Sequence, residues 1–136
     1  MEGDILLRMD DCQRKLPPHA AEGLRLFNTG AYFEAHEELE LAWREEAGGI
    51  RRLYQGILEA AVTYLHIQHG NYEGAVKVYG RGMKWLHLWP DRCCGVNVGK
   101  LRADLERALA EVQRLGPERL AEFDPSLFQP VEWSEE

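Results

Sequence analysis

One stretch of the chain places a histidine and two carboxylates at the spacing of successive helical turns. In the segment GAYFEAHEELELAWR, residues 30–44, His36 is followed by Glu37 and, one turn later, by Glu40. The run is similar to the motif His-Glu-x-x-His, in which two residues on adjacent turns bind zinc and the intervening glutamate acts as a base. Because Glu40 stands where the second histidine would be, a metal ion would need a further ligand from elsewhere in the chain.

The sequence around this run predicts that it lies on a single helix. The turn Asn28-Thr29-Gly30 precedes it, Gly48-Gly49 follows it, and no proline interrupts it. At about 100° per residue, one side of the helix is mostly apolar, with Glu40 at its edge; that side carries Tyr32, Ala35, His36, Leu39 and Trp43. We therefore expect the histidine and the carboxylates to border a core face, to which Tyr32 and Trp43 contribute as packing residues.

A second polar stripe lies on the next predicted helix, residues 50–69. Its members, Arg52, Gln55, Glu59, Thr63 and His66, share a narrow angular sector of an otherwise apolar helix. If a short connection makes the two helices antiparallel neighbours, the stripe faces His36 across a groove. The predicted polar cluster then consists of His36, Glu37, Glu40, Trp43, Gln55, Glu59 and His66. In the alternative interpretation, the stripe faces water and His36 only forms a hydrogen bond with Glu40.

The remaining sequence also predicts helices, because glycines and prolines divide it into segments without the sustained alternation of strands. We expect further helices over residues 17–28, 72–88 and 97–115, with Asn71 and Asn97 as N-caps of the last two. The segment 5–15 is expected to be a short helix or a frayed arm. After Pro117 we expect one short helical turn and then an extended arm, whose apolar residues pack on the bundle: Phe123, Leu127, Phe128 and Trp133.

An internal repeat relates two of these helices. Gly30, Tyr32, Ala35 and Leu39 correspond to Gly70, Tyr72, Ala75 and Tyr79, each 40 positions later. A helix, a tight glycine turn and a second helix that packs back are typical of tetratricopeptide-like hairpins. The sequence therefore predicts an all-α bundle of about five helices, built from two stacked antiparallel hairpins. We expect a single domain over residues 1–136, with the hairpin repeat at 24–88 and an amphipathic helix and tail at 97–136.

Composition and charge limit the partners and the compartment. The 136 residues contain 16 lysines and arginines against 23 aspartates and glutamates, a formal net charge of −7. This excess of negative charge disfavours nucleic acids and anionic membranes as partners. Neither a membrane-spanning run nor a signal peptide is recognisable, so we expect a cytoplasmic protein. The cysteines Cys12, Cys93 and Cys94 match neither a redox nor a zinc motif, and we expect them to be reduced thiols.

The segment from Leu24 to about Leu86 resembles the small helical family called domain of unknown function 309. The resemblance rests on the Asn28-x-Gly30 turn, Tyr32, the run His36-Glu37-x-x-Glu40-x-x-Trp43, Gln55-Gly56, Ala60-Ala61, His66, Gly70-Asn71 and Gly74-Ala75. It implies an all-helical bundle and assigns His36, Glu37, Glu40, Gln55 and His66 to the family pattern, but it implies no activity. Glu59 and Thr63 do not belong to the pattern, and the segments before Leu24 and after Leu88 lie outside it.

Two functions of different class fit these residues. The first is a noncatalytic helical module that binds a protein segment or a small molecule in the groove between its helices. The second is a divalent-metal-dependent hydrolase, in which His36 and Glu40, with Glu59 or His66, bind the ion and Glu37 is the general base. We favour the noncatalytic module, without a cofactor, because the ligand set is incomplete. The last helix and the apolar tail would serve either packing within the chain or contact in a homodimer.

Overall fold

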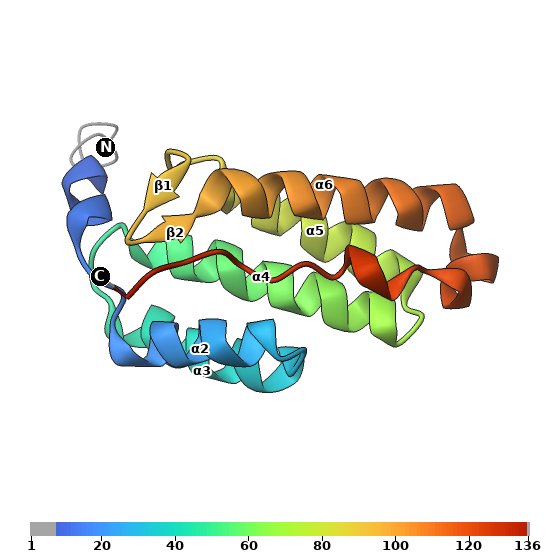
Figure 1. Cartoon of the computed structure of the whole chain (residues 1–136), viewed down its shortest axis with the longest axis horizontal. Coiled ribbons are helices and arrows are strands. Elements are labelled where there is room, and N and C mark those ends of the chain that lie inside the picture. Colours follow the sequence, from blue (N-terminus) through green and yellow to red (C-terminus); the bar gives the residue numbers. More distant parts are fainter. Residues whose placement is uncertain (1–7, 136) are drawn as a thin grey trace.

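Helices make up most of the computed structural model, which describes residues 8–135 (Figure 1). A 3-10 helix, η1 (Arg8–Gln13), precedes five α-helices: α2 (Pro18–Asn28), α3 (Tyr32–Glu45), α4 (Arg51–Gln68), α5 (Tyr72–Leu86) and α6 (Val98–Leu115). Two more 3-10 helices, η2 (Pro117–Glu122) and η3 (Pro125–Leu127), follow α6. The prediction of an all-α bundle is confirmed, and each predicted α-helix ends within two residues of the observed one. Of the segment 5–15, only the part from Arg8 lies in the described residues, where it is a 3-10 helix.

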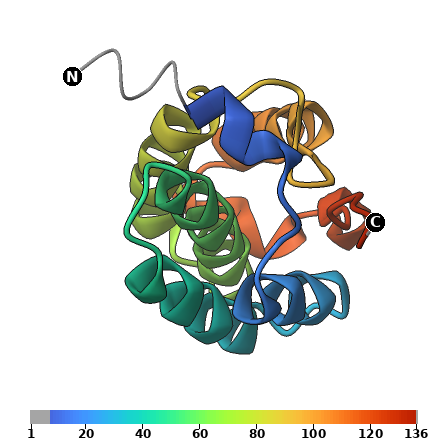
Figure 2. The ribbon, with the colours of Figure 1, turned by 90° about the vertical axis from the view of Figure 1, so that its left-hand side faces the viewer.

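The α-helices pack in chain order, each against the next from α2 to α6. Figure 2, which views the helices end on, shows α4 surrounded by the other elements. Ten of the 18 residues of α4 are buried, including Tyr54, Ile57 and Tyr64. Such a helix needs cover on almost every side, which explains why its sequence is the most apolar of the chain.

The two turns that reverse the chain before α3 and α5 have the same backbone geometry. Gly30 and Gly70 adopt φ values of 85° and 71°, a left-handed conformation that glycine adopts without strain. Their amides donate to the carbonyls of Phe27 and Ile67, the third residue back in each case. Each following helix begins two residues after its glycine, so the hairpins α2–α3 and α4–α5 are closed in the same way, 40 positions apart.

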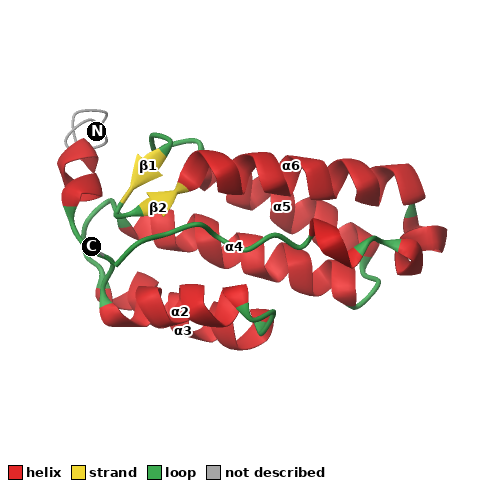
Figure 3. Ribbon diagram, in the orientation of Figure 1, coloured by secondary structure: helices red, strands yellow, loops and turns green. Residues whose placement is uncertain are grey.

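The expectation that the chain has no strands is wrong at one place. Residues Arg92–Cys93 (β1) and Val96–Asn97 (β2) form a small antiparallel hairpin, shown in yellow in Figure 3. Cys94 and Gly95, with φ values of 54° and 78°, form the turn, and two central residues with positive φ suit a two-residue hairpin. Strands of two residues are too short to produce the alternating pattern on which a sequence-based prediction depends.

The expectation of three reduced cysteines is also wrong. Cys12 in η1 and Cys93 in β1 form a disulfide between positions 81 residues apart, and Cys94 is a buried free thiol. Burial raises the pKa of the Cys94 thiol to about 11, so the thiol stays protonated at neutral pH. Disulfides are typical of oxidising compartments, and the cytoplasmic location stays a prediction.

Within residues 8–135, every helix falls short of the length and apolarity needed to cross a bilayer.

The C-terminal segment ends in an extended arm, as predicted, but two 3-10 helices, η2 and η3, precede it where one short helical turn was predicted. After η3, residues 128–135 run along α4 in the space between α2 and α6, as Figures 1 and 2 both show. The Phe128 ring lies 5.1 Å from the Tyr64 ring and 5.9 Å from the Tyr32 ring, centroid to centroid. Phe128 thereby joins an aromatic cluster that connects α3, α4 and this arm.

The contact between α4 and α5 predicts opposite effects for two glycine substitutions. A Cβ atom at Gly56 of α4 would lie 2.7 Å from Leu86 Cδ2, whereas a Cβ at Gly80 of α5 would meet no atom within 4 Å. We expect Gly56→Ala to lower the free energy of unfolding by roughly 1–3 kcal/mol through overpacking. Gly80→Ala should raise it by about 0.5–1 kcal/mol, because alanine loses less backbone entropy in a helix. Urea unfolding followed by circular dichroism measures both, and equal effects would contradict this account of the helix contact.

The disulfide predicts a stability that depends on reductant. Reduction or Cys12→Ser should lower the free energy of unfolding by roughly 2–4 kcal/mol, because the unfolded chain loses its large closed loop. Chemical denaturation with and without dithiothreitol measures the change, and the Cys12→Ser variant is the control in which reductant should do nothing further. A wild-type midpoint that is insensitive to reductant would argue against the pairing of Cys12 with Cys93.

Candidate functional site

A groove between α3 and α4 brings together most of the predicted polar cluster. Its volume is about 170 Å³, and it is lined by His36, Glu40, Trp43, Gln55, Leu58 and Glu59. Five of these six residues were predicted from the sequence, and the sixth, Leu58, adds an apolar contact. The antiparallel α3–α4 pair therefore places the two polar stripes opposite each other, as expected.

The α3 wall of the groove carries a chain of charged and aromatic contacts. His36 Nε2 lies 3.8 Å from Glu40 Oε1, and Glu40 Oε2 accepts a hydrogen bond of 2.8 Å from Arg44. The ring of Phe33, which is 50% exposed, lies 5.8 Å from the His36 ring. His36 and Glu40 both keep about a third of their side-chain surface exposed, so they are accessible from the groove.

The α4 wall carries a buried carboxylate. Glu59 is only 7% exposed, and Gly82 of α5 lies opposite it, so close that a Cβ there would be 3.0 Å from Glu59 Cβ. The only ion pair of Glu59 among the described residues is with Arg81 of α5, at a long 3.5 Å. Thr63 is buried as well, and its hydroxyl donates to the Glu59 carbonyl. The alternative in which the whole stripe faces water is therefore wrong for these two residues.

Trp43 and Gln55 form the end of the groove, near the start of α4. The guanidinium of Arg51 lies 4.3 Å from the centroid of the Trp43 ring, and its Nε donates to the Trp43 carbonyl. The indole Nε1 of Trp43 is buried and has no hydrogen-bond partner within the part of the chain that the structure describes. Gln55 Oε1 accepts a hydrogen bond of 2.6 Å from Arg52. Trp43 thus both packs the helix pair, as expected, and forms a wall of the groove.

Glu37 and His66 do not line the groove, so the predicted lining is wrong at these two positions. Glu37 is exposed, because it is turned about 100° from His36 around α3. His66 lies two turns beyond Glu59, about 10 Å along α4, where its Nδ1 is 3.2 Å from Asn71 Nδ2. Partial burial lowers the pKa of His66, and the neighbouring His69 and Arg81 lower it further.

The alternative metal set is not assembled. Among residues 8–135, no three histidine, cysteine, aspartate or glutamate side chains are grouped so that they could hold a metal ion. His36 and Glu40 are neighbours. Of the two third ligands considered, His66 lies away from them, and Glu59 lines the same groove but does not form such a group with them. The base expected for a hydrolase, Glu37, is also outside the groove.

Sequence reasoning missed the contributions of α5 to this site. Arg81 pairs with Glu59, and Gly82 allows α5 to approach α4 closely at that point. The signal in the sequence is Gly82, because a small residue within a helix indicates a close contact, whereas Gly80 faces open space. Its partner on α4 depends on how the two helices are packed, which spacing along one helix does not determine.

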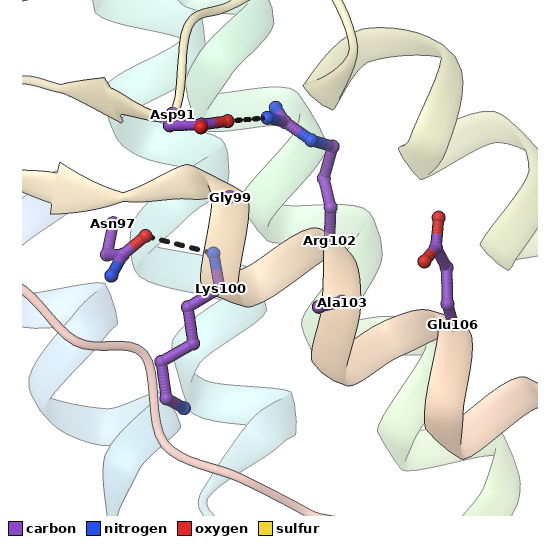
Figure 4. Close-up of a pocket in the computed structure, with 7 residues that line it drawn as sticks. All are labelled: Asp91, Asn97, Gly99, Lys100, Arg102, Ala103 and Glu106. Carbon is purple, nitrogen blue, oxygen red and sulfur yellow. Dashed lines mark hydrogen bonds and ion pairs between the residues drawn. The ribbon is translucent and has the colours of Figure 1, made fainter.

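A larger depression, of about 510 Å³, lies at the start of α6 (Figure 4). Its polar groups are largely engaged with one another. Arg102 points to Asp91, with 2.5 Å between Nη2 and Oδ1, and the Asn97 side chain accepts from the Lys100 amide as the N-cap of α6. The Lys100 ammonium forms an ion pair of 2.6 Å with the buried Asp104. We therefore assign this depression to helix capping and ion pairing, and keep the α3–α4 groove as the candidate site.

Comparison with known proteins places the groove in a segment that matches a family model. Over 98 residues, the chain is 32% identical to a protein of Aquifex aeolicus (strain VF5) described as uncharacterized. The alignment covers 69% of this chain but only 28% of that relative, so the chain spans less than a third of the relative's length. Residues 20–78 match the model of a family described as a domain of unknown function, DUF309. This segment contains every residue that lines the groove, and through this match the segment 20–78 is assigned to the domain of unknown function 309 family.

Proposed function

We propose that the protein is a noncatalytic binding module whose α3–α4 groove holds a cationic group of a protein segment or of a small molecule. The observation that carries the proposal is Glu59, a buried carboxylate in the wall of an open groove with a single, long ion pair among the described residues. A buried carboxylate needs several hydrogen-bond donors to offset the loss of water, and an ammonium or guanidinium group in the groove would supply them.

Two other groups in the groove favour a cation. Glu40 adds a second carboxylate, whose Oε2 is paired with Arg44 and whose Oε1 lies 3.8 Å from His36. The indole of Trp43 already has the guanidinium of Arg51 over its ring, which indicates that the ring attracts cations in this position. A lysine or arginine side chain that enters the groove would therefore meet negative charge on both walls and an aromatic surface at one end.

The rim of the groove supports a protein segment as the source of that cation. Phe33, whose ring lies beside that of His36, is a large apolar side chain on α3 that is 50% exposed. Exposed apolar residues next to a polar pocket are typical of protein contacts. We further infer that the hairpins α2–α3 and α4–α5 form a tetratricopeptide-like repeat, an architecture that commonly binds segments in its grooves.

Noncatalytic binding is also the function that needs fewest additional groups. The hydrolase alternative requires a base beside the bound ligand, and Glu37 lies outside the groove. Binding of a cation requires only the carboxylates and the aromatic wall, which the groove supplies.

The proposal predicts that binding depends on charge in both partners. We expect the tripeptide acetyl-Leu-Arg-Leu-amide to shift the NMR signals of His36, Glu40, Glu59 and the Trp43 indole N–H in a saturable manner. Glu59→Gln should weaken this binding about tenfold or more, because it removes a charge-assisted hydrogen bond. The same peptide with citrulline in place of arginine should bind no better to wild type than the arginine peptide binds to Glu59→Gln.

Two controls make this titration specific. Glu106→Gln is the same chemical change at an exposed position of α6, outside the groove, and should leave the affinity unaltered. Methylguanidinium tests whether a small molecule alone suffices; weaker binding than the tripeptide would favour a protein segment. Equal binding of the arginine and citrulline peptides, or an equal loss in Glu59→Gln and Glu106→Gln, would overturn the proposal.

A further inference from the structure

A second binding surface, independent of the α3–α4 groove, is already occupied by the chain itself. We call residues 128–135 the arm, and the residues of α2, α3, α4, the hairpin and α6 that hold it the arm groove. The Asn28 side chain recognises the arm backbone with both of its polar atoms: Nδ2 donates to the Val131 carbonyl at 2.9 Å, and Oδ1 accepts from the Val131 amide at 2.7 Å. A side-chain amide used in this way binds a peptide unit as a neighbouring strand would.

The hairpin continues this recognition along the arm. The Asn97 amide donates to the Glu132 carbonyl, the Ser134 amide donates to the Gly95 carbonyl, and Val96 and Trp133 form an antiparallel bridge. The arm therefore extends the hairpin by β-type pairing, the way in which many proteins bind an extended segment of another chain.

Side chains give the arm groove its selectivity. Val131 is 3% exposed, Phe128 enters the aromatic cluster of Tyr32 and Tyr64, and the Arg25 guanidinium lies 5.7 Å from the centroid of the Trp133 ring. The groove thus accepts large apolar side chains at three positions, spaced as Phe-x-x-Val-x-Trp.

Charge complementarity adds to this fit. Arg25 forms a 3.0 Å ion pair with Glu135, Arg92 lies 3.5 Å from Glu132, and the Lys100 ammonium donates to the Pro130 carbonyl. Arg25 and Lys100 also pair with Glu22 and Asp104, so the arm groove is a surface of mixed charge whose cationic groups face the acidic arm.

We propose that the arm groove also accepts the arm of a second copy of this chain, so that two copies exchange residues 128–135 and form a two-fold symmetric dimer. The second copy is the partner whose chemistry fits, because it carries the very segment that meets each of these contacts. Reciprocal exchange satisfies both grooves and closes the assembly.

The arm is suited to exchange by its own sequence. It has no helix of its own, and Pro130 biases Gln129 towards an extended conformation, so an undocked arm remains partly ordered. Eight extended residues span up to about 26 Å, enough to reach a neighbouring molecule. Docking within one chain is favoured by an effective concentration on the order of millimolar, so exchange is expected at comparable protein concentration.

The test uses two full-length variants with complementary defects. Asn28→Ala impairs the groove but leaves the arm intact, and Val131→Asp impairs the arm but leaves the groove intact. After the two are unfolded, mixed and refolded together at about 1 mM, arm exchange gives a mixed dimer with one intact arm in one intact groove. Native mass spectrometry should show mixed dimers in excess over the homodimers of either variant, and wild type should dimerise more than both.

Other outcomes overturn the proposal. A wild-type protein that stays monomeric after the same treatment contradicts exchange, as does a chain with both substitutions that dimerises as well as wild type. A synthetic peptide of residues 125–135 distinguishes the remaining occupant. If it binds the Val131→Asp variant while no dimer of any kind forms, the arm groove takes an acidic segment of a different protein and not a second copy.

Discussion

The burial of α4 is the constraint on which the rest of the structure depends. Its buried residues lie on many sides: α3 and α5 pack against it, and Phe128 of the C-terminal arm packs on Tyr64. Gly56 and Gly82 bring α5 close enough to exclude water from one of these sides. Both proposed binding surfaces follow from this arrangement. The α3–α4 groove forms where cover is incomplete, and the arm groove forms where an extended segment supplies the cover.

The burial of α4 also determines the surroundings of the Glu59 carboxylate. A carboxylate on a helix that is buried on most sides loses much of its hydration, and a single ion pair at 3.5 Å compensates this loss only in part. Replacement by an apolar residue of similar size would remove that cost, and this is the physical basis of the proposal that Glu59 binds a cationic ligand. The family assignment concerns the segment 20–78 and implies no activity, while the argument for binding rests on this side chain and its neighbours.

The helices could be predicted from the sequence because their signals are local. Asn71 and Asn97 cap α5 and α6 through hydrogen bonds to amides three residues later, as predicted, and the glycine turns appear where left-handed residues are required. The sequence also predicted that His36 and Glu40 would face Gln55 and Glu59, since helical spacing and a short connection determine which stripes meet. Spacing along one helix does not determine which helices converge. For this reason the prediction missed Arg81 of α5, and it placed His66 at the groove, although His66 lies two turns beyond Glu59 on α4.

The hairpin illustrates the opposite limit, because its structure depends on distant parts of the chain. Cys93 of β1 forms the disulfide to Cys12, and the turn and β2 form the hydrogen bonds to the arm. The small hairpin therefore connects the N-terminal 3-10 helix with the C-terminal arm. Two-residue strands bury too little surface to be stable alone, and they persist because each is fixed from outside. The left-handed Cys94 turn, whose amide donates to the Cys12 carbonyl, is held in the same way. The hairpin, stabilised by these contacts, offers backbone amides and carbonyls to an extended segment. A helix uses most of these groups internally, which is why the backbone pairing of the arm occurs at the hairpin.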